Sequence, residues 1–158
     1  LLRIAAWFMA FFEDESCGQC TPCREGLFAA KAALDRICGG TGEAADLGLL
    51  EELAEALAET SMCGFGRTAA LPIRSALAGF RSELEAHVGE KRCPAAVCKG
   101  LISYTINGKC TGCTLCARKC PEGAITGEKK ELHVIDQALC TQCGTCKDVC
   151  KFDAVEVH

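Results

Sequence analysis

Residues 110–150 read CTGCTLCARKCPEGAITGEKKELHVIDQALCTQCGTCKDVC, and this stretch holds eight of the fifteen cysteines of the chain. The eight cysteines form two copies of one pattern, CxxCxxCxxxC. The first copy consists of Cys110, Cys113, Cys116 and Cys120, and the second of Cys140, Cys143, Cys146 and Cys150. The offset of thirty residues between Cys110 and Cys140 indicates an internal duplication with a pseudo-two-fold axis.

The spacing of these cysteines favours metal clusters over the alternatives. Three thiolates separated by two small residues each can turn inward in a tight loop and hold one cube of iron and sulfide. A zinc ribbon needs two CxxC pairs for each ion. A disulfide framework needs cysteines spaced so that they can pair and cross-link separate segments of the chain. Two triads with two outlying cysteines fit neither arrangement.

The two copies resemble the loops of bacterial two-cluster ferredoxins. In that family the fourth cysteine of each copy binds the cluster of the other copy. The resemblance therefore implies one [4Fe-4S] cluster on Cys110, Cys113, Cys116 and Cys150, and a second on Cys140, Cys143, Cys146 and Cys120. Lys151 departs from the family pattern, which often has a second proline there, but the departure removes no ligand.

Length and composition allow two small domains and exclude some partners. The chain has 158 residues, 49 % of them hydrophobic, and a formal net charge of −4. We expect no nucleic-acid partner, because no basic face is apparent. The apolar run at residues 4–12 is too short to span a bilayer, and thiols that must stay reduced until iron is loaded predict a reducing cytoplasm. Because the sequence begins with Leu1 and not with methionine, we expect it to be a piece of a longer polypeptide.

Residues 1–90 predict an all-α, antiparallel four-helix bundle. Apolar residues at spacings of three and four indicate a first helix that ends before Cys17, and residues 24–37 favour a second that stops at Gly39 and Gly40. A third helix is expected from Asp46, a candidate N-cap. A fourth is expected to begin near Pro72 and to extend to residue 88.

The predicted bundle carries its own cysteine loop. Cys17, Cys20 and Cys23 repeat the three-ligand spacing between the first two helices, and the fourth ligand must come from elsewhere. Cys63 lies in the connection between the third and fourth helices, which in an up-and-down bundle is at the same end. We therefore predict Cys63 as the fourth ligand. The glycines at 39–42 and 64–66 are interpreted as cap and turn residues rather than a phosphate site.

The stretches ESCGQCTPCREG (15–26) and MCGFGRTAALPI (62–73) are similar to the C-terminal iron-sulfur bundle of the NADH-oxidising flavoprotein subunit of respiratory complex I. The same bundle occurs in the β subunits of NAD-linked iron-only hydrogenases and formate dehydrogenases. The resemblance covers about residues 1–90. It implies a [4Fe-4S] cluster on Cys17, Cys20, Cys23 and Cys63 that receives electrons from FMN, with FMN and NAD(P) sites only in an upstream part.

Residues 91–102 are expected to form a linker, and residues 103–158 a small α+β ferredoxin-like domain. Short strands are predicted at 104–107, 124–126, 133–136 and 154–157, with a short helix after each cysteine loop. A two-cluster ferredoxin appended to the bundle resembles the hydrogenase-type β subunits rather than the plain respiratory subunit. This favours a multi-subunit, electron-bifurcating hydrogenase as the parent.

Three cysteines remain after twelve are assigned to clusters. Cys38, at a helix end, is interpreted as a buried small hydrophobe. His87, Cys93 and Cys98 can supply three ligands to a structural zinc ion at the linker; Cys38, His133 or a residue outside the chain would be the fourth. The alternative is two surface thiols and a solvated histidine.

Nothing in the sequence indicates a catalytic site of its own. His133 and His158 have no nucleophile partner, and the glutamates at 51, 52, 55 and 59 are interpreted as a solvated helix face. We expect an electron-transfer part that connects a flavin to partner subunits and to a soluble ferredoxin through three [4Fe-4S] clusters. A formate dehydrogenase fragment, a structural or redox-sensing module, and an independent ferredoxin with a helical docking domain are the alternatives.

Overall fold

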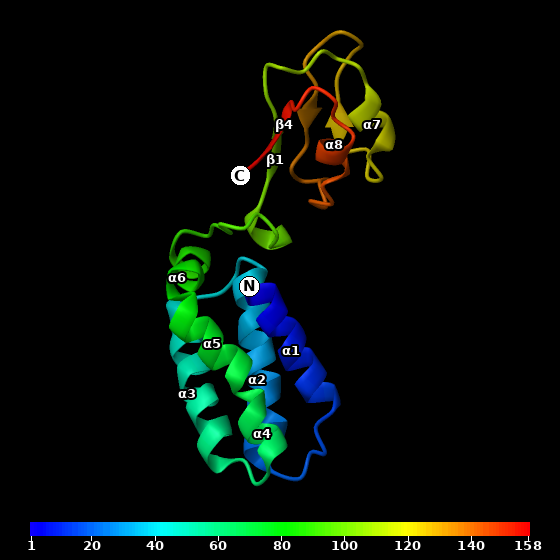
Figure 1. The fold of residues 1–158 in the computed structure, drawn as a ribbon. Helices are drawn as coiled ribbons and strands as arrows, with labels where there is room; N and C mark the ends of the chain where they lie inside the picture. The colour runs from blue at the N-terminus through cyan, green and yellow to red at the C-terminus, as the bar shows by residue number, and fades with distance from the viewer. The chain divides into compact units, whose positions relative to one another are not determined.

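In the computed structural model, which describes residues 1–158, the chain divides into two units, Leu1–Leu101 and Ile102–His158 (Figure 1). The first unit is helical and the second combines short helices with two small sheets. The stretch expected as a linker, 91–102, lies almost wholly in the first unit. No helix has the length and apolar character needed to cross a bilayer.

Six α-helices and one 3-10 turn build the first unit. They are α1 (Leu2–Asp14), α2 (Thr21–Cys38), α3 (Ala44–Thr60), α4 (Gly64–Ala69), α5 (Leu71–Gly79), α6 (Arg81–Gly89) and η1 (Lys99–Leu101). Leucine, alanine and isoleucine side chains from α1, α2, α3 and α5 form one core, in which Leu27, Leu57 and Met9 are fully buried. The glutamates predicted to be solvated, at 51, 52, 55 and 59, are exposed.

The fourth predicted helix differs from the structure. Instead of one helix from Pro72 to residue 88, α5 ends at Gly79 and α6 starts at Arg81. The break lies at Phe80, whose φ of −135° and ψ of 31° are not helical. The glycines at 64–66, expected in a turn, instead form the first turn of α4, for which Cys63 is the N-cap residue.

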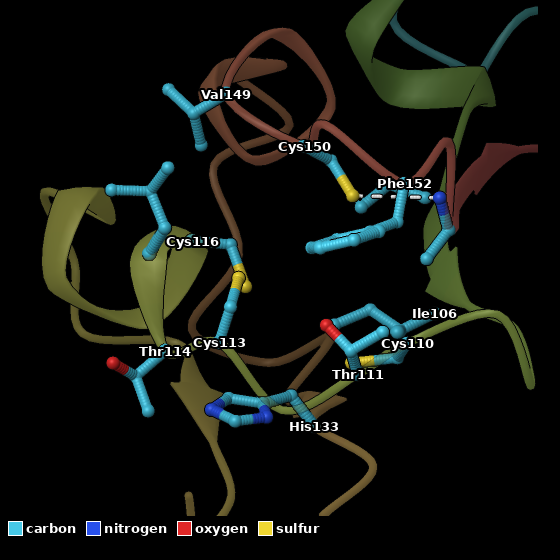
Figure 2. A pocket seen from close by; sticks show the side chains of 13 residues that line it. Ile106, Cys110, Thr111, Cys113, Thr114, Cys116, His133, Val149, Cys150 and Phe152 are labelled. Atoms are coloured by element: carbon cyan, nitrogen blue, oxygen red, sulfur yellow. Dashed lines mark hydrogen bonds between the residues drawn. The ribbon is translucent and has the colours of Figure 1, made fainter. Parts of the chain in front are cut away.

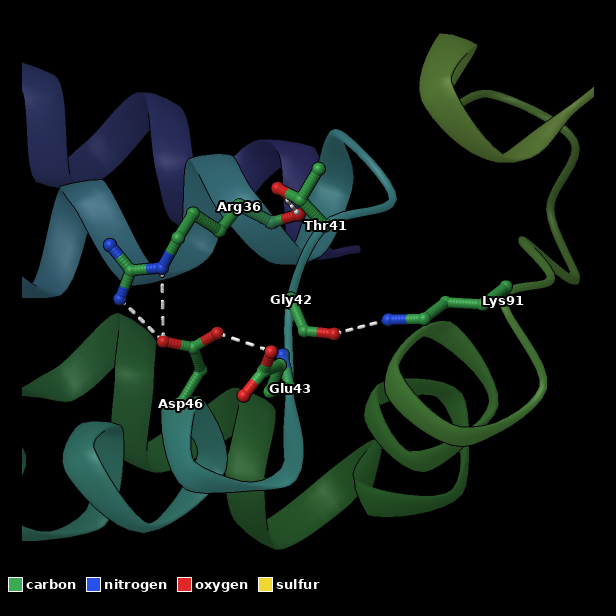
Figure 3. Close-up of polar contacts among 6 residues, drawn as sticks. All are labelled: Arg36, Thr41, Gly42, Glu43, Asp46 and Lys91. Carbon is green, nitrogen blue, oxygen red and sulfur yellow. Dashed lines mark hydrogen bonds and ion pairs between the residues drawn. The ribbon is translucent and has the colours of Figure 1, made fainter.

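The start of α3 also differs from the prediction, because its N-cap is Glu43 and not Asp46. Asp46 occupies the third helical position, where its carboxylate accepts the backbone N–H of Glu43 at 2.9 Å in a capping box. The same carboxylate pairs with Arg36 of α2, and Lys91 donates to the Gly42 carbonyl (Figure 3). These contacts fix the α2–α3 connection beside the segment that follows α6.

A row of apolar side chains lies uncovered on α1. Trp7 is 63 % exposed, and Phe8 and Phe11 pack against its ring. The opposite face of α1 buries Leu2, Ala5 and Met9 in the core. The helix is therefore apolar on both faces, and only one of them is used within this chain.

The second unit contains β1 (Tyr104–Ile106), α7 (Leu115–Lys119), β2 (Ile125–Thr126), β3 (Val134–Ile135), α8 (Thr145–Asp148) and β4 (Val155–Val157). β1 pairs antiparallel with β4, with Tyr104 opposite Val157, and β2 pairs antiparallel with β3, with Ile125 opposite Ile135. Strands therefore lie where the sequence predicted them, and each cysteine loop is followed by a short helix.

The backbone repeats with the same offset as the cysteines. Positive φ angles occur in pairs thirty residues apart: Gly112 (65°) with Gln142 (49°), Thr114 (64°) with Gly144 (83°), and Gly123 (63°) with Asp153 (49°). Residues other than glycine adopt this region at a cost, which is tolerated where the surrounding structure fixes the conformation. The two cysteine loops thus share their conformation as well as their spacing.

Candidate metal centres

Three cysteines of the helical unit lie around the start of α2. Cys17 precedes the helix, Cys20 is its N-cap residue, and Cys23 is in the first turn, where it is 5 % exposed. Gly18 allows the tight loop between the first two because it adopts a φ of 72°. Pro22, near the first helical position, preorganises the turn that carries Cys23.

The connection that carries Cys63 reaches the same loop. The backbone of Met62, which lies near the Cys20 sulfur, is the main cause of the lowered pKa of that thiol. Cys63 follows Met62 directly. The structure therefore brings the segment of the predicted fourth ligand to the cysteine loop at the α1–α2 connection, across forty residues of sequence.

Two serine hydroxyls beside these cysteines were not found by sequence reasoning. Ser16 Oγ lies 3.3 Å from the Cys23 sulfur. Ser61 is 1 % exposed, and its hydroxyl has no hydrogen-bond partner in the protein. A hydroxyl one or two residues before a ligand cysteine, as in ESC and SMC, is the only sequence signal that points to either residue.

In the second unit, the first cavity is small, with a volume of about 20 Å³, and gathers cysteines from both copies of the motif (Figure 2). Cys110, Cys113 and Cys116 come from the first loop, and Cys150 comes from the end of the second copy. Phe152 is among the mainly apolar residues that complete the lining. This is the grouping that the ferredoxin resemblance implied for one cluster.

The second cavity mirrors the first and also has a volume of about 20 Å³. Its cysteines are Cys140, Cys143 and Cys146 from the second loop, together with Cys120 from the end of the first copy. Tyr104 is among the side chains that line it, and burial raises the pKa of its hydroxyl. Each cavity therefore collects three neighbouring cysteines and one distant one.

The environment of these thiols couples metal binding to the release of protons. Burial raises the pKa of Cys116, and it raises that of Cys146 to about 11. Without a metal these two thiols hold their protons at neutral pH, so that loading a cation must release them. The exposed Cys143 behaves differently, because hydrogen bonding with Thr145 lowers its pKa.

His133 lines the first cavity and is 1 % exposed. Its Nδ1 lies 3.1 Å from the Glu131 carbonyl oxygen and must donate to it, since a carbonyl can only accept. Nε2 is buried without any partner in the protein. With Nδ1 donating, the neutral ring offers Nε2 only as an acceptor, and it could donate to a cluster sulfur only as an imidazolium.

The three residues predicted as zinc ligands come together in the helical unit. His87 is completely buried, Cys93 is 6 % exposed, and Cys98 is 2 % exposed. Their ligand atoms all lie within 4.8 Å of one another. Two of the residues were expected to be surface thiols in the alternative interpretation, and that interpretation is wrong for both.

Hydrogen bonding fixes the histidine of this group in a metal-binding orientation. Nδ1 of His87 donates to the Glu83 carbonyl at 2.7 Å, so Nε2 carries the lone pair in the neutral ring. Nε2 faces the sulfur of Cys98 at 3.4 Å. Metal-bound histidines commonly hold their second nitrogen in this way against a backbone carbonyl.

Cys38, expected to be a buried hydrophobe, is half-buried and adjoins the same group. Hydrogen bonding between the Cys38 and Cys98 thiols lowers the pKa of Cys38 and raises that of Cys98 far above its usual range. The backbones meet directly behind these thiols, because a Cβ on Gly100 would overlap the carbonyl of Gly39. Cys38 is therefore a further thiol beside the three residues of the group.

Two family models match the chain. Residues 3–87 match the model described as the NADH-ubiquinone oxidoreductase-F iron-sulfur binding region. Residues 109–155 match the 4Fe-4S dicluster domain. The chain therefore contains two regions of the 4Fe-4S-binding type, one for each structural unit.

The sequence similarity to known proteins covers either one structural unit or both. The NADP-reducing hydrogenase subunit HndC of Solidesulfovibrio fructosivorans is 48 % identical over 98 % of this chain, which spans 32 % of that relative. An NADH-quinone oxidoreductase subunit of Rhizobium meliloti is 45 % identical over 60 % of the chain and 22 % of its own length. The chain thus spans a third or less of these two relatives.

A solved structure matches the fold as well. A chain of an NAD+-reducing [NiFe]-hydrogenase, determined in the H2-reduced state, superposes on 55 % of this chain with a TM-score of 0.53 and 40 % identity. The match takes up 15 % of that hydrogenase chain.

Proposed function

This chain belongs to the family of the NADH-ubiquinone oxidoreductase-F iron-sulfur binding region, and from that premise we propose that it conducts electrons through three [4Fe-4S] clusters in a multi-subunit NAD(P)-linked oxidoreductase. A hydrogenase-type parent is favoured over a formate dehydrogenase. The support is the similarity to the HndC subunit over both units, including the ferredoxin-like part. FMN and NAD(P) would bind in a part of the parent outside these residues.

For the helical unit we propose Cys17, Cys20, Cys23 and Cys63 as the ligands of the first cluster. The observation that supports Cys63 is the approach of its segment to the cysteine loop, since a Cβ on Gly66 would lie 3.4 Å from the Cβ of Cys23. The buried Ser61 hydroxyl has no hydrogen-bond partner in the protein, which supports the presence of a polar group, such as a cluster, beside it. In this proposal the run α4–α6 acts as the fourth arm of a four-helix bundle that encloses one side of the cluster.

For the ferredoxin-like unit we propose the crossed ligand sets, Cys110, Cys113, Cys116 and Cys150 on one cluster and Cys140, Cys143, Cys146 and Cys120 on the other. The observation that carries this assignment is the membership of the two cavities, each of which takes its fourth cysteine from the other copy. A direct assignment would need Cys120 in the first cavity, and it lines the second.

When bound, a [4Fe-4S] cluster accepts and donates one electron at a time. The work of the chain is to hold each site and to set its surroundings. Apolar side chains such as Phe152 and Ile106 exclude water from the first cavity, and Tyr104 and Ile125 do so in the second. Backbone amides and hydroxyls that contact the ligand sulfurs adjust how readily an electron is accepted.

The iron content tests the number of clusters. Three cubes predict about twelve irons and twelve acid-labile sulfides per chain after anaerobic reconstitution. Cys63→Ser should reduce the iron to about eight and remove one EPR signal, whereas Cys38→Ser, outside the cluster sets, should keep all twelve. Eight irons in the unchanged protein, or an unaltered spectrum in Cys63→Ser, would contradict the assignment.

Reduction by the parent enzyme tests the role. We expect NADH or NADPH to reduce the bundle cluster anaerobically in the intact complex, and a soluble ferredoxin to exchange electrons with the second unit. A structural or sensing module has no need for either reaction. A complex whose clusters bind fully but stay oxidised while the flavin is reduced would favour that alternative.

We also propose a structural zinc ion bound by His87, Cys93, Cys98 and Cys38. Three cysteines and one histidine form a closed tetrahedral set that is typical of structural zinc. The buried, mutually close donor atoms and the fixed His87 ring support the site. Its role would be to bind the end of α2 to the segment that precedes the ferredoxin-like unit, since Cys38 ends α2 and Cys98 immediately precedes η1.

Metal analysis tests this site separately from the clusters. The intact protein should contain about one zinc per chain. Cys38→Ser and the double variant Cys93→Ser/Cys98→Ser should lose the zinc and retain the iron. Absence of zinc after purification without chelator, together with unchanged stability of the double variant, would rule the site out.

The remaining proposals concern location and partners. We propose a cytoplasmic location, because thiols that await metal require reducing conditions. The partners would be other subunits of the oxidoreductase and a soluble ferredoxin. The support is that the similar proteins are named as subunits of hydrogenase and NADH-quinone oxidoreductase.

A further inference from the structure

The hydroxyl of Ser16 is oriented by its neighbours toward a ligand sulfur. The backbone N–H of Gly18 donates to Ser16 Oγ at 3.3 Å. The same oxygen lies 3.3 Å from the Cys23 sulfur. A hydroxyl that accepts from an amide keeps its own hydrogen for donation, and a metal-bound thiolate can only accept. The O–H group of Ser16 is therefore the donor, and Cys23 Sγ is the acceptor.

Cys23 is the ligand at which such a bond has the greatest effect. It is the most buried cysteine of its set, at 5 % exposure, whereas Cys17 and Cys63 are exposed. Hydrogen bonds are electrostatically stronger where water is excluded. Ser16 is also the only side-chain hydroxyl whose contact with a sulfur of this set is resolved.

The Ser61 hydroxyl lies near the same ligand. A Cβ built on Gly66 would be 2.5 Å from Ser61 Oγ and 3.4 Å from the Cβ of Cys23, so only the missing side chain of Gly66 separates the two residues. A buried hydroxyl without a partner costs about 1–3 kcal/mol. An acceptor supplied by the cluster would remove this cost.

We propose that Ser16 is a positioning residue that raises the reduction potential of the cluster on Cys17, Cys20, Cys23 and Cys63 by donating an O–H···S hydrogen bond to Cys23, with Ser61 as a second donor. This inference rests on the proposed function. The reduced cluster carries one more negative charge than the oxidised cluster, so hydrogen-bond donors stabilise the reduced form more and raise the potential.

The test is an EPR-monitored redox titration of the intact parent complex. Ser16→Ala should lower the midpoint of the bundle cluster, with about a tenfold smaller ratio of reduced to oxidised cluster at a fixed potential. For one electron this equals a shift of about 59 mV. Ser16→Thr, which retains the hydroxyl, should keep the original midpoint. Ser75→Ala, at an exposed position of α5, is the matched control.

The iron content and the midpoints of the other clusters should stay constant in all three variants. An unchanged midpoint in Ser16→Ala with full iron content overturns the inference, and so does an equal shift in Ser16→Thr. A wild-type complex without any EPR signal that Cys23→Ser removes would instead overturn the proposed function. The two failures are therefore distinguishable.

A second measurement decides the case if Ser16→Ala loses its cluster. A brief exchange into D2O replaces hydroxyl protons before most buried amide protons. Pulsed EPR of the reduced wild-type cluster should then show a coupled deuteron. The absence of this coupling overturns the inference, whatever the variant does.

Discussion

Replacing Gly66 by alanine should damage the bundle cluster selectively. Gly66 lies in α4, and a Cβ at this position would be 2.5 Å from Ser61 Oγ and 2.7 Å from Ser61 Cβ. Ordinary carbon contacts are about 3.5–4 Å. Ser61 is 1 % exposed, and its carbonyl is held by Arg67 Nε at 3.0 Å, so it has no open space into which to move.

The loss of stability in Gly66→Ala can be estimated by comparison with the same substitution at another helical glycine. Overpacking of a filled site costs about 1–3 kcal/mol, while alanine gains up to about 1 kcal/mol of helix propensity over glycine. Gly48, in α3, meets nothing within 4 Å when a Cβ is added, so Gly48→Ala receives the propensity gain alone. We therefore expect Gly66→Ala to be about 1–3 kcal/mol less stable than Gly48→Ala.

Denaturant unfolding and iron analysis measure the two consequences. Because Ser61 is two residues before Cys63, its displacement should move that ligand and lower the occupancy of the bundle cluster, with the ferredoxin-like signals retained. The double variant Gly66→Ala/Ser61→Gly removes both atoms that clash and should regain the cluster. Equal stability of Gly66→Ala and Gly48→Ala, with twelve irons in each, would refute this reasoning.

Three further predictions concern other parts of the chain. Arg36 lowers the pKa of Asp46 in the folded protein. The contribution of this carboxylate to the free energy of unfolding is therefore present above its unfolded pKa of about 3.8, and it is lost as the pH falls through the folded value. Asp46→Asn should cost about 1 kcal/mol at pH 7 by chemical denaturation, and this difference in stability should vanish toward pH 2. Gly100→Ala, which places a Cβ on the Gly39 carbonyl, should lower the zinc content while the iron stays constant in metal analysis. Cys150→Ser should remove the same EPR signal as a change in the first ferredoxin loop, and loss of the second-loop signal instead would contradict the crossed assignment.

The sequence predicts the repeated cysteine loops better than the ends of the helices. Ligand spacing is local, and the loops at Cys110 and Cys140 adopt the repeated conformation that their repeated spacing indicates. Helix ends depend on competing contacts. Asp46 has the composition of an N-cap, yet its pairing with Arg36 and the Glu43 amide places it inside α3.

Contacts between segments distant in sequence could not be predicted. The approach of Gly39 to Gly100 requires the absence of two side chains and leaves no periodic signal, so the sequence alone does not choose between a core position and a ligand role for Cys38. The break at Phe80 is likewise invisible, since the apolar spacing continues from Ile73 to Leu84 across it. Ser16 and Ser61 have roles that depend on atoms a few ångströms away, which no spacing rule describes.

Each proposed centre combines a local set of ligands with one that is distant in sequence. Cys63 is forty residues from Cys23, and Cys38 is forty-nine residues from His87. A metal that joins such residues closes a loop, and by the chain-entropy model a link across forty to fifty residues stabilises the folded chain by about 4 kcal/mol. The local ligands can gather in an unfolded chain, but the distant ligand arrives only when the helices have packed. Metal binding and folding are therefore coupled at each centre.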